Sequence, residues 1–144
     1  RLLRRHGIRV STCNMIGIPG ETPEMIEETI QLNRALAPDD LQFSVFYPYP
    51  MTELHDRVVE EGLLRPERSL AGYYDRASAL DLPTITPTEL AAAYDRFAAL
   101  KAELRARREH PWRYRLRRLA LALLGGDERR LRRLLGLVRR RRER

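Results

Sequence analysis

One stretch near the start of the chain decides how the rest is interpreted, and it reads Asn14-Met15-Ile16-Gly17-Ile18-Pro19-Gly20-Glu21-Thr22. It joins the end of an apolar run to a glycine- and proline-containing turn and then to a good helix N-cap. In α/β folds such turns build small-molecule sites, because ligands bind at the carboxyl ends of parallel strands. Taken alone, the pattern favours a tight strand–helix turn with a capped helix over a ligand site, and it lacks the spacing and the lysine of a phosphate-binding P-loop.

The flanking residues predict a strand–helix–strand unit. Ile8 to Ile18 is expected to form a strand covered on both faces, and Leu41 to Tyr47 a second strand. Thr22 should cap the helix between them, with Pro23 at its first position, and Ala37-Pro38-Asp39-Asp40 should end it. This order predicts a parallel sheet. The helix is expected to bury a stripe of residues at helical spacing, widened by two isoleucines: Met25, Thr29, Leu32 and Leu36, with Ile26 and Ile30.

Helices are expected after the second strand. The prolines of Tyr47-Pro48-Tyr49-Pro50 take the chain out of the sheet, and a short helix from Glu53 to Glu61 should stop at Gly62. Thr86-Pro87-Thr88-Glu89 is a capping box that opens a long helix to about Arg108. The irregular stretch between these helices should pack back on the body through Tyr73-Tyr74 and Leu80-Asp81-Leu82-Pro83.

The end of the chain is strongly basic. From Lys101 onward there are 17 basic and 5 acidic residues, whereas residues 1–100 hold 10 basic and 15 acidic ones. Gly125-Gly126 separates two amphipathic segments, and Arg139 to Arg144 should fray into solvent. The tail suits RNA, through phosphate contacts and stacking, or an anionic membrane surface, but a solvated helix face is the preferred interpretation. Its apolar stripes are Trp112, Leu116, Leu119 and Leu123, then Leu131, Leu134, Leu135 and Val138.

Cysteine and histidine usage argues against a metal site formed by this chain alone. Cys13 is the single cysteine, which excludes an internal disulfide and a cysteine-based cluster, and its mid-strand position predicts a small buried apolar group. His6 and His55 lack partners at metal-ligand spacing, and His110, followed by Pro111, is a helix-stop residue. We therefore expect no metal ligand in the chain.

The sequence also bears on compartment and completeness. It shows no membrane-spanning run and no signal-peptide pattern, so a reducing, cytoplasmic setting is expected. There is no initiator methionine, and the segment from Arg1 to Gly7 is typical of the last turn of a helix followed by a glycine stop. We expect the chain to be a piece of a longer protein.

Both strand ends resemble those of the radical S-adenosylmethionine (radical SAM) superfamily. The first quoted segment, with the acidic helix after it, is similar to that family's fifth-strand segment. The second strand and its continuation, Phe46-Tyr47-Pro48-Tyr49-Pro50-Met51-Thr52-Glu53-Leu54, are similar to its sixth strand. The two segments occur in the family's order, about one helix apart. The resemblance covers Arg1 to about Leu64, and the stretch from Gly62 through the Thr86 helix resembles C-terminal regions of cobalamin-binding radical SAM proteins.

The resemblance implies an α/β fold: the C-terminal piece of a partial (β/α)6 TIM-like barrel followed by a mostly helical extension. Residues 1–64 would belong to the barrel, 65–110 to the extension and 111–144 to a basic tail. In the family, a Cys-x-x-x-Cys-x-x-Cys loop binds a [4Fe–4S] cluster that cleaves SAM to a 5′-deoxyadenosyl radical. That loop is absent here, so the chain is expected to be an enzyme fragment, inactive by itself and dependent on the missing N-terminal part. Its substrate would be a small molecule or a lipid, and cobalamin a further possible cofactor.

The resemblance also implies roles for residues at the strand ends. Ile16, Gly17 and Ile18 would flank the adenine of SAM, and Tyr47 and Pro48 would lie near it, largely through backbone. The turn itself would be fixed by Pro19, Gly20, Glu21 and Thr22. Glu21 is expected to be structural, and no catalytic residue is assigned. Met51 stands where the family usually has glycine, which predicts a less sharp turn there.

Two other functions stay open. One is a methylthiotransferase-like radical SAM enzyme that modifies tRNA, for which a β-rich RNA-binding domain should follow the barrel. The other is a non-catalytic helical adaptor that binds RNA or membrane through its arginine-rich tail, with activity independent of iron and SAM.

Overall fold

A computed structural model describes residues 2–65, 76–127 and 129–131 of the chain. The chain divides into two compact units, residues 1–105 and residues 106–144, and each is described by itself. The roles predicted for Tyr73-Tyr74, for the second apolar stripe beyond Leu131 and for Arg139 to Arg144 fall outside the described residues.

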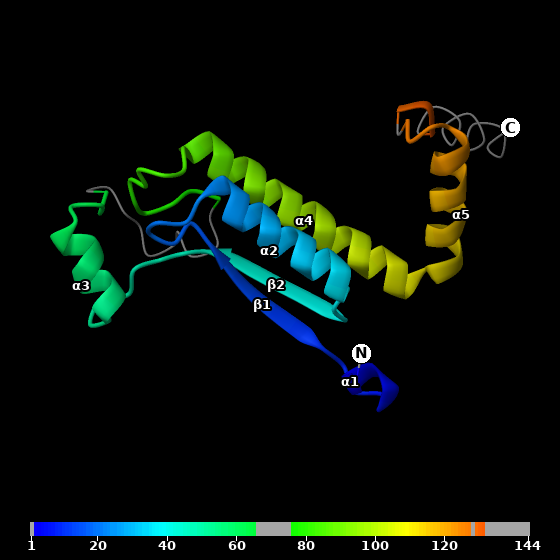
Figure 1. The fold of residues 1–144 in the computed structure, drawn as a ribbon, viewed down its shortest axis with the longest axis horizontal. Coiled ribbons are helices and arrows are strands. Elements are labelled where there is room, and N and C mark those ends of the chain that lie inside the picture. The colour runs from blue at the N-terminus through cyan, green and yellow to red at the C-terminus, as the bar shows by residue number, and fades with distance from the viewer. Residues whose placement is uncertain (1, 66–75, 128, 132–144) are drawn as a thin grey trace, which may run out of the picture. The chain divides into compact units, whose positions relative to one another are not determined.

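The first unit is built on two parallel strands joined by a helix. β1 (Ser11–Ile16) pairs in register with β2 (Asp40–Val45), so that the first residues of both strands are opposite each other, as are the last. α2 (Pro23–Leu36) connects them (Figure 1). Immediately before the first paired residues, the Val10 amide donates to the Asp39 carboxylate over 2.8 Å, which fixes where pairing starts. The predicted α/β order and parallel pairing are confirmed, with both strands shorter than expected.

Local capping sets the ends of α2. The Thr22 hydroxyl accepts from the Met25 amide over 3.4 Å, and Pro23 occupies the first turn, as predicted. At the other end Ala37 adopts a left-handed conformation, with φ of 47°, and its amide donates to the Asn33 carbonyl over 2.8 Å. An alanine therefore occupies the position where glycine is usual.

The predicted buried face of α2 is only partly correct: Ile26 and Ile30 are buried as expected, but the main stripe is not. Met25, Leu32 and Leu36 are 53%, 58% and 51% exposed, whereas the buried side chains are those of Ile26, Ile30 and Asn33. The two sets have the same helical spacing and differ by one position, a rotation of about 100° around the helix. Periodicity alone cannot choose between two such stripes, and the sheet contacts the one that contains an asparagine.

Asn33 ties α2 to both strands through a closed hydrogen-bond network. Its Oδ1 accepts from the Thr12 hydroxyl over 2.8 Å, and its Nδ2 donates to Asn14 Oδ1 over 2.7 Å and to the Thr29 carbonyl over 2.9 Å. Asn14 in turn donates to the Gln42 carbonyl over 3.0 Å. Asn33 is only 2% exposed, so these bonds offset the cost of removing its amide from water.

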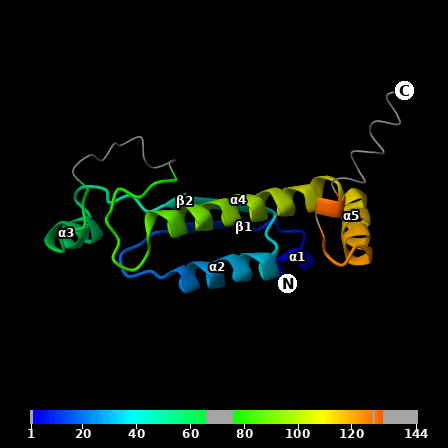
Figure 2. The ribbon, with the colours of Figure 1, turned by 90° about the horizontal axis from the view of Figure 1, so that it is seen from above.

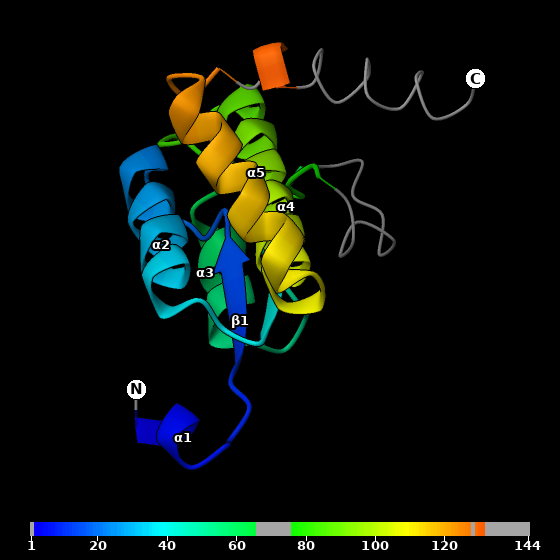
Figure 3. The ribbon, with the colours of Figure 1, turned by 90° about the vertical axis from the view of Figure 1, so that its right-hand side faces the viewer.

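A long helix completes the core. α4 (Pro87–Glu109) begins with the predicted capping box: the Glu89 amide donates to Thr86 Oγ1 over 3.2 Å, and the Thr86 amide donates to Glu89 Oε2 over 2.9 Å. Hydrogen bonds from the Thr86 hydroxyl and amide lower the pKa of Glu89. α4 runs beside α2 on one side of the sheet (Figures 1 and 3). Both helices and both strands contribute to one buried cluster: Ile16, Ile26, Ile30, Leu41, Val45, Ile85, Leu90, Ala93, Phe97 and Leu100.

The opposite face of the sheet is open in the described part of the unit. Cys13 and Gln42 are exposed there, Met15 is 44% exposed, and Ser44 is partly covered. The predictions of a strand covered on both faces and of a buried Cys13 are therefore wrong. The reason is that α2 and α4 pack on the same side, so alternate residues of β1 have no partner layer.

Beyond the ends of the strands, a short helix packs through a second cluster. α3 (Glu53–Glu60) lies past the sheet in Figures 1 and 2, and Gly62 follows it with φ of +66°, as predicted. Phe46, Val58 and Leu80 form the buried centre, which confirms that Leu80 packs back on the body. Partly buried neighbours surround them: Ile18, Leu54, Leu63, Leu64 and Leu82.

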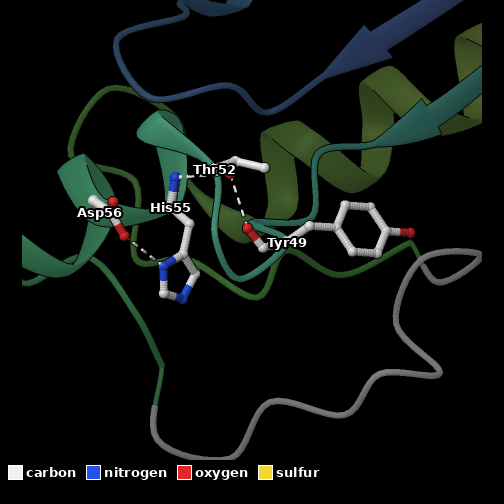
Figure 4. Close-up of polar contacts among 4 residues, drawn as sticks. All are labelled: Tyr49, Thr52, His55 and Asp56. Carbon is white, nitrogen blue, oxygen red and sulfur yellow. Dashed lines mark hydrogen bonds and ion pairs between the residues drawn. The ribbon is translucent and has the colours of Figure 1, made fainter.

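The turn before α3 is sharp, although a methionine stands where a glycine would be expected. Met51 has φ of +67° and is 97% exposed, so the left-handed conformation forms even though a side chain disfavours it, and the turn is not relaxed as expected. Figure 4 shows the cap that follows: Thr52 Oγ1 accepts from the His55 amide over 3.2 Å and donates to the Tyr49 carbonyl over 2.8 Å. His55 Nδ1 lies 3.3 Å from Asp56 Oδ1.

Two helices lie nearer the ends of the chain. α1 (Leu2–Arg5), in the first unit, is followed by Gly7 with φ of +70°, as the helix-and-glycine-stop pattern predicts. In the second unit, α5 (Pro111–Leu123) ends before Gly125 and Gly126, both of which have positive φ. Within the described residues, none of the helices has the length and apolar character needed to cross a bilayer.

Candidate functional site

The candidate site is the edge where both strands end. The Phe46 amide donates to the Ile16 carbonyl over 2.8 Å, one step beyond the last paired residues of the ladder. The turn that begins at Gly17 and the segment through Tyr47 and Pro48 therefore leave the sheet at the same end and next to each other (Figure 1). This is the position at which parallel α/β sheets bind ligands.

Both the backbone conformation and the surrounding packing require a glycine at position 17. Its φ is +76°, and a Cβ added there would lie 3.2 Å and 3.4 Å from the two methyl carbons of Leu90 and 3.6 Å from Val45 Cγ1. Because Leu90 is buried in the first core, it has little room to move away. Gly17 is thus required where α4 comes close to the end of β1.

A tight turn follows Gly17. The Glu21 amide donates to the Ile18 carbonyl over 2.9 Å, with Pro19 and Gly20 at the two central positions. Gly20 has φ of +84°, and a Cβ there would meet no atom within 4 Å. Proline followed by a glycine at positive φ is the pattern of a type II turn, so the residues predicted to fix this turn do so.

The Glu21 side chain closes the turn from within. Its Oε2 accepts from the Gly17 amide over 2.6 Å and more weakly from the Ile18 amide at 3.4 Å. Burial raises the pKa of the Glu21 carboxyl, while the hydrogen bonds from the Gly17 and Ile18 amides oppose that rise. The Thr84 hydroxyl donates to the Glu21 carbonyl and anchors the turn to the segment before α4. Glu21 has the geometry of a structural residue.

The side chains predicted to line adenine differ in how much they are exposed. Ile16 is fully buried in the first core, so at this edge it offers only its backbone. Ile18 is partly buried beside the second cluster and keeps some open apolar surface. Tyr47 and Pro48 are buried, so their side chains are not accessible at this edge. The Gly17 amide is bonded to Glu21, the Ile18 carbonyl accepts from the Glu21 amide, and the Glu21 carbonyl accepts from Thr84. A ligand would therefore meet this turn mainly at the Ile18 side chain.

The two residues that contact the turn after β1 and hold it in place were not predicted from the sequence. Leu90 and Thr84 lie more than sixty residues further along the chain than the turn they hold, so no local pattern shows the contact. An apolar hollow of about 190 Å³ lies nearby, but no residue of the two strand-end segments lines it; its walls include Leu82, Ile85, Pro87, Leu90 and Ala91. In the part of the chain that the structure describes, no three metal-binding side chains come together.

No protein-family model matches this chain, and no curated protein gives a significant match.

Proposed function

We propose that this chain is the C-terminal part of a radical SAM enzyme and that it supplies the adenine side of the SAM site. One observation carries the proposal: the two strand-end segments that resemble the family's fifth and sixth strands leave a parallel sheet side by side, with the Phe46 amide bonded to the Ile16 carbonyl. Loops at opposite ends of the sheet would leave no shared wall. Radical SAM enzymes generate a radical by reductive cleavage of SAM.

The exposed surfaces of the first unit support a larger, partial (β/α)6 barrel. Two parallel strands are too few for a stable sheet by themselves, and such strands are normally covered on both faces. Here one face is open at Cys13 and Met15, which in a barrel would be directed to the interior. The apolar side chains on the outer side of α2, Met25, Leu32 and Leu36, are exposed as well. The other strands of a barrel would enclose the open face, and a helix beside α2 would cover its exposed stripe.

The cofactors differ in how well this chain fits them. A [4Fe–4S] cluster does not fit, because Cys13 is the single cysteine of the sequence and the described residues contain no group of metal ligands. Its ligands must come from other sequence of the same enzyme. For the adenine of SAM, the edge offers the partly exposed Ile18 side chain and the backbone at Tyr47. Nothing in the chain identifies a substrate or a use of cobalamin.

The tRNA-modifying alternative lacks support from the described residues. The regular elements after β2 that the structure describes are the helices α3, α4 and α5, whereas that function calls for a β-rich RNA-binding domain. We therefore keep the general radical SAM proposal.

The proposal is tested by SAM affinity in the complete enzyme. Ile18→Ser should raise the Kd for SAM about fivefold, the equivalent of about 1 kcal/mol for a partly exposed aliphatic side chain. Leu54→Ser is the matched control, because Leu54 is another partly buried neighbour of the same second cluster but comes from α3. Equal effects of the two substitutions on SAM binding would argue against the adenine wall.

A second test uses the chain by itself. Reconstitution with iron and sulfide should give no iron-dependent absorbance band, and SAM binding should be weak. A stable cluster on this chain would contradict the division of the site between two stretches of sequence.

A further inference from the structure

Helix α5 displays an apolar stripe that no described part of its own unit covers. Trp112, Leu116, Leu119 and Leu123 are 60%, 58%, 62% and 88% exposed, and α5 contains no buried residue. At 3.6 residues per turn these four side chains lie within about 60° of one another. Large side chains gathered on one exposed face mark an interaction surface.

The charges on α5 are of one sign. The helix carries four arginines and no acidic residue. Arg113 and Arg115 border the stripe on its two sides, and the Arg113 guanidinium lies 5.0 Å from the centre of the Trp112 ring. Arginines beside an apolar stripe keep their charged ends in a polar layer while their stems cover apolar surface.

A hollow beside the stripe adds further positive charge. Its volume is about 580 Å³, and Leu119 of the stripe forms part of its wall. Three arginines line it, Arg107, Arg115 and Arg118. The hollow therefore combines apolar surface and guanidinium groups, which suits a phosphate group attached to an apolar chain.

We propose that α5 binds the surface of an anionic lipid bilayer, lying in the interface with its stripe toward the acyl chains. The helix has 13 residues and is about 20 Å long. A helix that lies parallel to the membrane surface does not have to be long enough to span the bilayer. The stripe enters the apolar layer, and the arginines on either side meet lipid phosphates. This inference is independent of the proposed SAM site.

Two other occupants explain less of the surface. RNA would pair with the arginines and could stack on Trp112, but it leaves the leucines in water. A second copy of the helix would cover the leucines, but α5 has arginines and no acidic residue, so two copies would offer each other no opposite charge. An anionic lipid surface would both bury the apolar stripe and pair the arginines with phosphate groups.

Trp112 provides the test, because it is the single tryptophan of the chain and stands in the stripe. Emission of the full chain is recorded with phosphatidylcholine vesicles, with mixed phosphatidylcholine–phosphatidylglycerol vesicles and with a single-stranded RNA. The expected result is a blue shift with the phosphatidylglycerol vesicles that high salt weakens, and little change with the others. No shift with anionic vesicles, or a larger response to RNA at the same salt concentration, overturns the proposal.

A pair of variants identifies the surface. Leu116→Ser should weaken vesicle binding about tenfold, whereas Leu32→Ser on α2 should leave it unchanged. Both leucines are 58% exposed on a helix, so the two substitutions remove similar apolar area. Equal loss of binding in both variants would show adhesion of any exposed leucine and would refute a role for α5.

Discussion

Replacing Gly17 by alanine separates backbone conformation from packing at the start of the candidate site. Gly17 and Gly20 both have positive φ, +76° and +84°, and they differ in what an added Cβ would meet. An alanine in this conformation costs about 1–2 kcal/mol, partly offset by about 0.4–1 kcal/mol because alanine restricts the unfolded chain. Gly20→Ala should therefore lose about 1 kcal/mol of unfolding free energy.

Gly17→Ala should lose more. Its Cβ would lie 3.2 Å from a methyl carbon of Leu90, a buried side chain of the core, and such overpacking adds about 1–3 kcal/mol. We expect a total loss of about 2–4 kcal/mol. Urea unfolding of both variants, followed by far-UV circular dichroism, measures the difference.

A double variant checks the cause. Leu90→Ala alone should cost about 2–5 kcal/mol, because it removes a buried side chain. Combined with Gly17→Ala, the loss should fall short of the sum of the two single losses by about 1 kcal/mol or more, because the added methyl occupies space that Leu90 leaves. Equal destabilisation by Gly17→Ala and Gly20→Ala, or additive losses in the double variant, would refute the packing argument.

Three further outcomes follow from individual residues. Glu21→Gln should become more stable relative to the wild type as the pH rises. Burial raises the pKa of Glu21, so the folded wild type keeps this proton to a higher pH than the unfolded chain does, and its free energy of unfolding falls through that range. A stability difference that is constant with pH in urea titrations would contradict this. Asn33→Ala should cost about 1–3 kcal/mol, because Thr12 and Asn14 lose a buried partner, and thermal unfolding that matches the wild type would be the opposing result. Met51→Gly should raise the free energy of unfolding by up to about 1 kcal/mol, seen as a higher midpoint in urea, since it removes a side chain from a left-handed residue. A lower midpoint would show that Met51 makes a stabilising contact.

Much of the fold could be predicted because its signals are local. The caps at Thr22 and Thr86, the proline–glycine turn and the strand–helix–strand order each depend on a few neighbouring residues. The sequence also placed both strand ends together, because parallel strands joined by one helix must end on the same side.

The parts that could not be predicted depend on contacts distant in sequence. Two stripes of α2 have the same spacing, so only the packing shows that Asn33 faces the sheet and that Leu32 does not. The polar pair Thr12 and Asn14 on one face of β1 was the available sign that a polar partner would be buried there. Exposure of Cys13 follows from which face the helices cover, and a single strand does not reveal that.

The candidate site was predictable in position but not in chemistry. Its border is made of backbone and the Ile18 side chain, since the side chains of Ile16, Tyr47 and Pro48 are buried. Residue types say little about a surface of this kind. The iron–sulfur cluster of the proposed enzyme would need ligands from other sequence, because this chain has one cysteine.

The most direct measurement of the central proposal is the formation of 5′-deoxyadenosine from SAM by the complete enzyme, followed by mass spectrometry under reducing conditions. We predict iron-dependent formation of this product in step with methionine, and a higher SAM requirement in the Ile18→Ser enzyme than in the Leu54→Ser control. A reading frame without the three-cysteine loop upstream of Arg1, or an iron-loaded enzyme that leaves SAM intact, would contradict the proposal.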